Sequence, residues 1–176
     1  MTVEPRPEPR IVPARVEHLE QIAAFADRLW RAYFPGIISL EQIEHMLARQ
    51  YALEVLSQEI VSGGVSYDRM LLGSDLIGFA SYGPAQSPDE MKLHKLYVAC
   101  ELHGKGYGSR LLAHVESTAR RCGYKTLVLS VNKRNHQAIA LYRRRGFTVR
   151  EAVVADIGSG FVMDDYVMVK ELGEQA

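Results

Sequence analysis

Apolar residues in the first third of the chain are spaced as in amphipathic helices. After a short strand predicted over residues 10–14, apolar side chains recur every three or four positions and so gather on one helix face. Pro35 and Gly36 end this helix, and Ser39 with Gln42 forms a capping box that begins a second one. The predicted buried positions are Leu19, Ile22, Ala23, Ala26, Leu29, Trp30 and Tyr33 in the first helix and Ile43, Met46 and Leu47 in the second.

The later segments predict short strands and two further helices. Apolar runs bounded by turn residues indicate an antiparallel meander, and one run rich in β-branched residues is typical of a strand covered on both faces. A terminal hairpin is predicted around Gly158, Ser159 and Gly160, and Cys122 is assigned to a buried helix face. The predicted strands are 67–72, 76–82, 91–98, 126–131, 147–157 and 161–170, and the predicted helices are 108–122 and 135–145.

Length and composition indicate a single globular domain. The chain has 176 residues, of which 47% are hydrophobic and 24% charged, and this excludes disordered and fibrous classes. Residues 1–10, which contain three prolines, are predicted to form a flexible arm, and residues 11–176 form the domain. Because no apolar leader or membrane-spanning run is present, we expect a cytoplasmic protein that does not bind membranes.

The cysteine content and the charge limit the choice of ligands. Cys100 and Cys122 are too few for a disulfide framework or a four-ligand zinc site, so no metal is expected. Lysines plus arginines balance aspartates plus glutamates at 21 each, which gives no general attraction to nucleic acid. Residues 103–150 nevertheless carry 11 basic residues against one acidic residue, Glu116. That block suits a polyanionic ligand, although its arginines at 143–145 also lie favourably at a helix C-terminus.

A glycine-rich turn between a strand and a helix is the segment that best indicates chemistry. Gly104, Gly106 and Gly108 let the backbone approach a ligand, and the helix start presents unpaired N–H groups, so an anion cradle is predicted. A P-loop would need a lysine directly after its last glycine, whereas Lys105 stands between two glycines, so this motif is excluded. A dinucleotide fingerprint would need an acidic residue about 20 positions further on. Lys125 and Thr126 stand there instead, which argues against this motif.

Two motifs here resemble those of the GNAT superfamily of N-acetyltransferases. One is the strand 96–98 with the turn 103–108, which is similar to the family's acetyl-CoA signature, R/Q-x-x-G-x-G/A after an L-x-V strand. The other is the block from Asn135 to Phe147, which resembles the family's N-x-x-A-x-x-L-Y-x-x-x-G-F pattern. His103 stands where the family has Gln or Arg, and an imidazole can still donate a hydrogen bond to a phosphate.

The resemblance implies an α/β fold and a cofactor. The fold is a mixed, mostly antiparallel twisted sheet of about six to seven strands, flanked by about four helices and splayed between the fourth and fifth strands to admit acetyl-CoA. Strand 96–98 would pair with the pantetheine arm, the N–H of Val98 would point at the acetyl carbonyl, and turn 103–109 would hold the pyrophosphate. The implied cofactor-binding residues are Leu96, Tyr97, Val98, His103, Gly104, Lys105, Gly106, Tyr107, Gly108, Ser109, Asn132, Asn135 and Tyr142.

Two residues are candidates for moving protons. Tyr142 matches the family's motif tyrosine, and its phenol keeps a proton to donate at neutral pH; the alternative is a ring that only packs. The strand before the turn has no carboxylate at 91–95, so His94 is the candidate base or water relay. By strand alternation it shares a face with Lys92, Leu96 and Val98, and it is equally well explained as a half-exposed polar residue.

The acceptor side is less defined by the sequence. Trp30, Tyr33 and Phe34 would form a wall of the acceptor pocket, and Asp164 and Asp165 would attract a cationic amine. We expect a small-molecule amine, such as a polyamine, an amino acid or a drug. A protein N-terminus or lysine, a non-catalytic acyl-CoA sensor and a homodimer stay open as alternatives.

Overall fold

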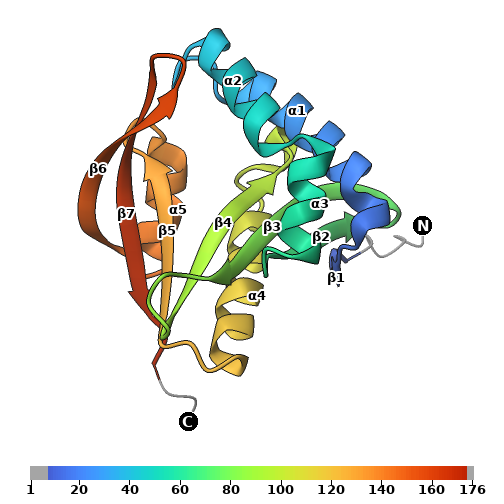
Figure 1. Cartoon of the computed structure of the whole chain (residues 1–176). Coiled ribbons are helices and arrows are strands. Elements are labelled where there is room, and N and C mark those ends of the chain that lie inside the picture. Colours follow the sequence, from blue (N-terminus) through green and yellow to red (C-terminus); the bar gives the residue numbers. More distant parts are fainter. Residues whose placement is uncertain (1–7, 174–176) are drawn as a thin grey trace.

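The computed structural model describes residues 8–173 as a seven-stranded sheet with helices on both faces (Figure 1). The sheet order is β1-β2-β3-β4-β5-β7-β6. The strands are β1 (Arg10–Pro13), β2 (Ser66–Leu72), β3 (Asp75–Pro84), β4 (Glu90–Val98), β5 (Thr126–Asn132), β6 (Thr148–Gly158) and β7 (Phe161–Glu171). The helices are α1 (Leu19–Tyr33), α2 (Leu40–Gln50), α3 (Leu53–Val61), α4 (Tyr107–Arg121) and α5 (His136–Arg144). Short 3₁₀ turns cover Val16–His18 and Cys100–Leu102.

The predicted splay between the fourth and fifth strands is confirmed. β4 and β5 are parallel and pair only from Glu90 opposite Thr126 to Leu93 opposite Leu129. All other neighbours in the sheet are antiparallel. Beyond Leu93 the two strands diverge, and Figure 1 shows the halves of the sheet opening away from each other above this point.

Each face of the sheet has its own hydrophobic cluster. On one face α1, α2 and α3 pack against β2 and β3 around Ile22, Leu56 and Phe79. On the other face α4 and α5 pack against the central strands, with Leu112 and Leu127 wholly buried. The divergence of β4 and β5 therefore opens a slot through the sheet between two separately packed faces.

The tips of the two halves are joined above the slot. The β6–β7 hairpin contacts α2, where His45 Nε2 lies 2.8 Å and Arg49 Nη1 2.5 Å from the Ile157 carbonyl oxygen. Arg134, in the loop after β5, donates to the carbonyl oxygens of Gly36 (2.7 Å) and Ile37 (2.9 Å) after α1. These contacts tie the two halves of the fold together at one end of the slot.

Helix α3 was not predicted, so the expected four helices are five. Its N-cap, Ala52, has no side-chain capping bond, and Leu56 is its only fully buried residue among those described. The sequence thus lacks both the start signal and the apolar stripe that identify α1 and α2.

A β-bulge in β4 alters which side chains share a face. Ser81 pairs with Lys95 and Tyr82 with Leu93, so His94 is an additional residue in the strand. Leu93, Leu96 and Val98 consequently all pack toward α4. The prediction that His94 shares a face with Leu96 and Val98 is wrong, because it assumed unbroken alternation.

The predictions for the N-terminal arm and for Cys122 can be compared with the described residues. Residues 1–7 of the predicted arm lie outside the described residues, and Arg10 belongs to β1. Cys122 is exposed rather than buried, because α4 ends at that residue. Within residues 8–173, no helix is both long and apolar enough to cross a membrane.

Candidate active site

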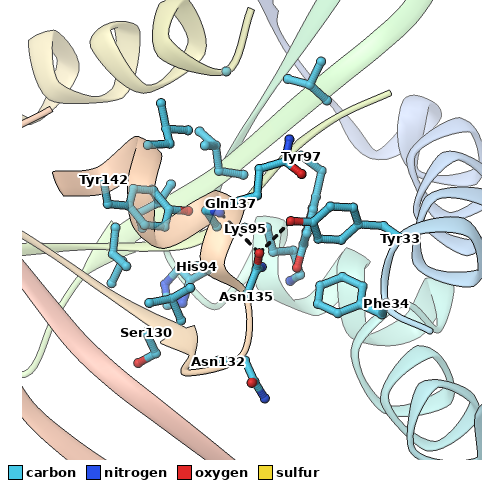
Figure 2. Close-up of a pocket in the computed structure, with 18 of the residues that line it drawn as sticks. Tyr33, Phe34, His94, Lys95, Tyr97, Ser130, Asn132, Asn135, Gln137 and Tyr142 are labelled. Carbon is cyan, nitrogen blue, oxygen red and sulfur yellow. Dashed lines mark hydrogen bonds between the residues drawn. The ribbon is translucent and has the colours of Figure 1, made fainter. Parts of the chain in front are cut away.

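A cavity of about 740 Å³ occupies the slot and extends over both faces of the sheet. One end lies at the glycine turn and α5, and the other lies between β4 and helices α1 and α3 (Figure 2). Most predicted site residues line it. They are Trp30, Tyr33, Phe34, His94, Leu96, Tyr97, Val98, His103, Gly104, Gly106, Gly108, Ser109, Asn132, Asn135, Tyr142 and Asp165. Lys105, Tyr107 and Asp164 do not line it.

The glycine turn has the geometry of an anion cradle. Gly104 and Gly106 have φ values of 76° and 86°, a backbone conformation that side-chain-bearing residues rarely adopt. A Cβ at either position would meet open space, so the side of the turn next to these glycines is not filled by protein. Among the described residues, the backbone N–H groups of 104–109 have no acceptor, and the first helical bond joins Arg110 N to Gly106 O at 3.0 Å. These donors and the positive end of α4 suit a pyrophosphate.

The backbone of β4 presents hydrogen-bonding groups to the slot. Ala99 donates its N–H to a β3 carbonyl at 2.9 Å. In an antiparallel pair, residues bonded to the partner alternate with residues whose N–H and C=O point to the other edge. Leu96 and Val98 therefore direct these groups toward β5, which has diverged from β4 at this level. The Val98 N–H is therefore directed into the slot.

His103 is used within the protein rather than offered to a phosphate. Its Nε2 lies 2.8 Å from the Val98 carbonyl oxygen, and its Nδ1 lies 3.1 Å from Gln137 Nε2. Its backbone N–H bonds to the Cys100 carbonyl at 3.1 Å. Both ring nitrogens are thus engaged within the protein, so the expected donation to a phosphate would require the bond to Val98 to break. His103 instead fixes the end of β4 against α5.

Tyr142 projects from α5 into the cavity (Figure 2). Its ring is 8% exposed and packs against Phe147 at a centroid distance of 5.7 Å. Burial raises the pKa of Tyr142 above that of a free phenol, and the nearby Tyr97 and Tyr33 raise it further. The hydroxyl thus retains its proton over the whole physiological range.

Asn135 links α5 to α1 across the slot. Its Oδ1 accepts from the Ala138 N–H at 3.3 Å, so Asn135 caps α5, and from the Tyr33 hydroxyl at 2.6 Å (Figure 2). Asn132 lies at the end of β5, where its Oδ1 accepts from the Arg134 N–H at 2.9 Å. Both asparagines stabilise the loop that borders the cavity.

Aromatic rings form the end of the cavity that lies under α1. Trp30 and Phe34 stack with centroids 4.3 Å apart, and the edges of both rings approach Tyr97 at 6.1 and 6.4 Å. Tyr33 stands next to Phe34 and meets the His103 ring edge-on at 5.5 Å. The predicted aromatic wall therefore exists, and it suits an aliphatic chain or a cation.

A buried ion pair at this end of the cavity was missed by sequence reasoning. Lys95 Nζ lies 3.1 Å from Glu59 Oε2 and 2.7 Å from the Tyr67 hydroxyl, and only 7% of the Lys95 side chain is exposed. Desolvation lowers the pKa of Lys95, although Glu59 opposes the shift. Both residues line the cavity. Glu59 comes from the unpredicted α3, so no sequence signal paired it with β4.

Two titratable residues face the middle of the cavity. At His94, desolvation and the charges of Lys92 and Lys95 lower the pKa to about 4. At Asp165, desolvation and the neighbouring Asp164 raise the pKa to about 6. Asp164 itself is exposed and forms a salt bridge with Lys133.

Much of the basic charge between residues 103 and 150 is used in structural contacts. Arg145 pairs with the buried Glu116 at 2.9 Å, and Arg150 pairs with Glu90 at 2.5 Å. Arg144 lines the cavity. The charge excess therefore reflects internal pairing as well as the ligand end of the cavity.

The sheet is splayed, the start of α4 forms an anion cradle, and one edge of β4 is unpaired. These features together define a class of protein that binds a pyrophosphate-containing cofactor in an extended conformation along the slot. The GNAT acetyltransferase family matches residues 22–147. A spermidine N(1)-acetyltransferase of Thermoplasma acidophilum is 31% identical over 153 residues, which cover 85% of this chain and 91% of that protein. An L-methionine sulfoximine/L-methionine sulfone acetyltransferase of Salmonella typhimurium is 37% identical over 75 residues, or 41% of this chain and 44% of that protein.

A solved structure extends the likeness to nearly the whole fold. The PaiA N-acetyltransferase of T. acidophilum in complex with coenzyme A aligns with a TM-score of 0.79 and 26% identity, covering 93% of this chain and 99% of that one. The chain belongs to the GNAT acetyltransferase family. It is an acetyl-CoA-dependent N-acetyltransferase.

Proposed function

We propose that this enzyme acetylates a primary amine of a small aliphatic polyamine. The observation that carries the proposal is the combination of an aromatic wall with a carboxylate, Asp165, in the same cavity. Aromatic faces attract ammonium groups and pack against methylene chains, and the carboxylate adds an opposite charge. The spermidine acetyltransferase that aligns over 85% of this chain supports the same class.

The cavity residues fit acetyl-CoA, which supplies an acetyl group activated as a thioester. The unpaired N–H groups of residues 104–109 would hold its pyrophosphate, and the open edge of β4 would hold its pantetheine arm. The Val98 N–H would donate to the acetyl carbonyl oxygen, where negative charge develops during transfer. Tyr142 would hold a proton at its hydroxyl for the departing sulfur.

An amino-acid acceptor is the second candidate, because the Lys95 ammonium lies in the cavity wall and could pair with a substrate carboxylate. The partial likeness to the Salmonella enzyme is consistent with this class. Lys95 is already neutralised by Glu59 at 3.1 Å, which favours the polyamine. We also place the enzyme in the cytoplasm, since its two cysteines are free.

An acceptor panel tests the proposal by measuring thiol release from acetyl-CoA. Spermidine and spermine are compared with L-methionine sulfone, a lysine-containing peptide and a simple alkylamine. We expect the highest kcat/KM for the polyamines. Faster turnover of the amino acid or the peptide would overturn the polyamine assignment. Tight acetyl-CoA binding without turnover of any acceptor would instead indicate a non-catalytic sensor.

A further inference from the structure

Asp165 carries a buried oxygen that has no partner within the described part of the chain. Its Oδ1 is shielded from solvent and accepts no hydrogen bond from any described group. The side chain lines the cavity. A buried carboxylate oxygen without a donor is costly, so this atom is suited to meet a donor that arrives with the substrate.

The strand register places Asp165 on the acceptor side of the slot. Asp165 pairs with Asn132, three residues beyond the last β4–β5 pair, at a level where the slot is open. Side chains alternate along β7: Met163 packs with the α1–α3 cluster, and Tyr166 packs on the opposite face. Asp165, two residues after Met163, faces the same side as Met163 and the aromatic wall.

The proton donor and this carboxylate lie on opposite faces of the sheet. Tyr142 belongs to the α4–α5 cluster, on the face where the glycine cradle opens. Tyr97 belongs to the α1–α3 cluster, and its pKa is raised to about 12 by desolvation and, in smaller part, by the Asp165 charge. Asp165 therefore faces β4 across the slot. An amine that enters under α1 would therefore find Asp165 on the same side of the sheet.

The charged groups around Asp165 leave it free to accept a proton. Lys92 on β4 and Lys133 after β5 favour its ionised form, whereas Asp164 opposes it. Lys133 is already engaged by Asp164, so Asp165 itself has no salt-bridge partner among the described residues. Its pKa of about 6 lies close to neutral pH, where a general base is most effective. The pKa of His94 is about 4, which makes His94 a weaker proton acceptor.

We propose that Asp165 is the general base of the reaction and takes the proton from the acceptor ammonium at Oδ1. This step rests on the proposed amine acceptor. An N–H bond of the ammonium breaks, its proton passes to the carboxylate, and the freed electron pair on nitrogen forms the new bond to the acetyl carbon. The carbon–sulfur bond breaks, and its electron pair leaves with sulfur, which takes the Tyr142 proton. The acylated nitrogen still carries one extra proton. This proton passes to the Tyr142 phenolate and restores the phenol, and Asp165 releases its own proton to solvent.

The test compares Asp165→Asn with Asp164→Asn, which removes the same charge one residue away but outside the cavity. In the wild type, kcat/KM for spermidine should rise through about pH 6 and then level off. D164N should keep the plateau and reach it at a lower pH, because loss of the Asp164 charge lowers the pKa of Asp165. In D165N, kcat should fall about 100-fold at pH 7. The kcat/KM of D165N should keep rising until the pH exceeds the pKa of the amine. Without the carboxylate, only amine molecules that are already neutral in solution can react.

A second acceptor separates base catalysis from charge recognition. Trifluoroethylamine is already neutral at pH 7, so its turnover should be nearly equal in the wild type and D165N. A D165N enzyme with raised KM, unchanged kcat and a retained plateau would assign Asp165 to recognition only and overturn the proposal. A plateau that is lost in His94→Gln and kept in D165N would move the role to His94. Failure of the polyamine assignment gives a different result from failure of the base assignment: the wild-type enzyme would be inactive on polyamines but active on another amine in the panel.

Discussion

Replacing Tyr142 by phenylalanine removes one oxygen from the site and little else. The ring packs against Phe147 and is 8% exposed, and these contacts stay with phenylalanine. The hydroxyl lines the cavity and forms no hydrogen bond with the described residues, so its removal leaves no partner unsatisfied. Thermal stability and acetyl-CoA affinity should therefore be nearly unchanged.

Turnover by Tyr142→Phe should nevertheless fall sharply. Loss of a positioned proton donor costs about 100-fold or more, and 100-fold corresponds to about 2.7 kcal/mol of activation free energy. Because burial raises the pKa of Tyr142, the wild-type kcat should not decline through loss of this proton below about pH 10. The assay is thiol release at saturating acetyl-CoA, with Tyr124→Phe, a tyrosine outside the cavity, as the control. A Tyr142→Phe enzyme within about twofold of the wild-type kcat would show that the ring only packs.

Two further predictions concern the cradle and the stability of the sheet. Gly106→Ala should weaken acetyl-CoA binding in calorimetry, whereas Gly73→Ala, which imposes the same kind of left-handed strain in the β2–β3 turn, should lower only the melting temperature; equal affinities in the two variants would contradict the cradle. Desolvation raises the pKa of Asp68, but hydrogen bonds from His114 and Tyr82 outweigh it, so the net pKa is lowered. A lowered carboxyl pKa stabilises the fold above the unfolded-state value, and this contribution is lost as the pH falls through the folded-state pKa. Denaturant titrations at several pH values should show that Asp68→Asn loses this acid-dependent part of the stability.

The sequence predicts the glycine turn and the start of α5 well, because these features are local. The glycines at 104 and 106, the cap at Asn135 and the tyrosine at 142 each depend on neighbours within a few positions. A turn conformation or a helix cap is therefore encoded in one short segment. The structure adds the direction of the Val98 N–H, which depends on the β3 register.

The acceptor side depends on contacts between distant segments, and most of its details were not predictable. The Glu59–Lys95 pair joins residues 36 positions apart, from a helix without start signals and a strand. The bulge at His94 comes from pairing with β3 and has no glycine to mark it. The sequence predicts Asp165 as an acceptor-side residue. The face of the sheet on which it lies follows from Met163, because residues two positions apart in a strand point to the same side.

In the proposed mechanism, the slot lets one chain carry out its two proton transfers on opposite faces of the sheet. A sheet that stayed paired along β4 and β5 would keep its two faces apart, and no group on one side would reach a reactant on the other. Because pairing ends at Leu93 and Leu129, the β4 edge is open to both faces at the level of Val98. In the proposed mechanism, Tyr142 would act from the face covered by α4 and α5, and Asp165 would act from the face covered by α1–α3. We expect a substitution that restored pairing beyond Leu93 to abolish catalysis while it strengthened the sheet, because it would use the backbone groups that the proposed pantetheine pairing needs.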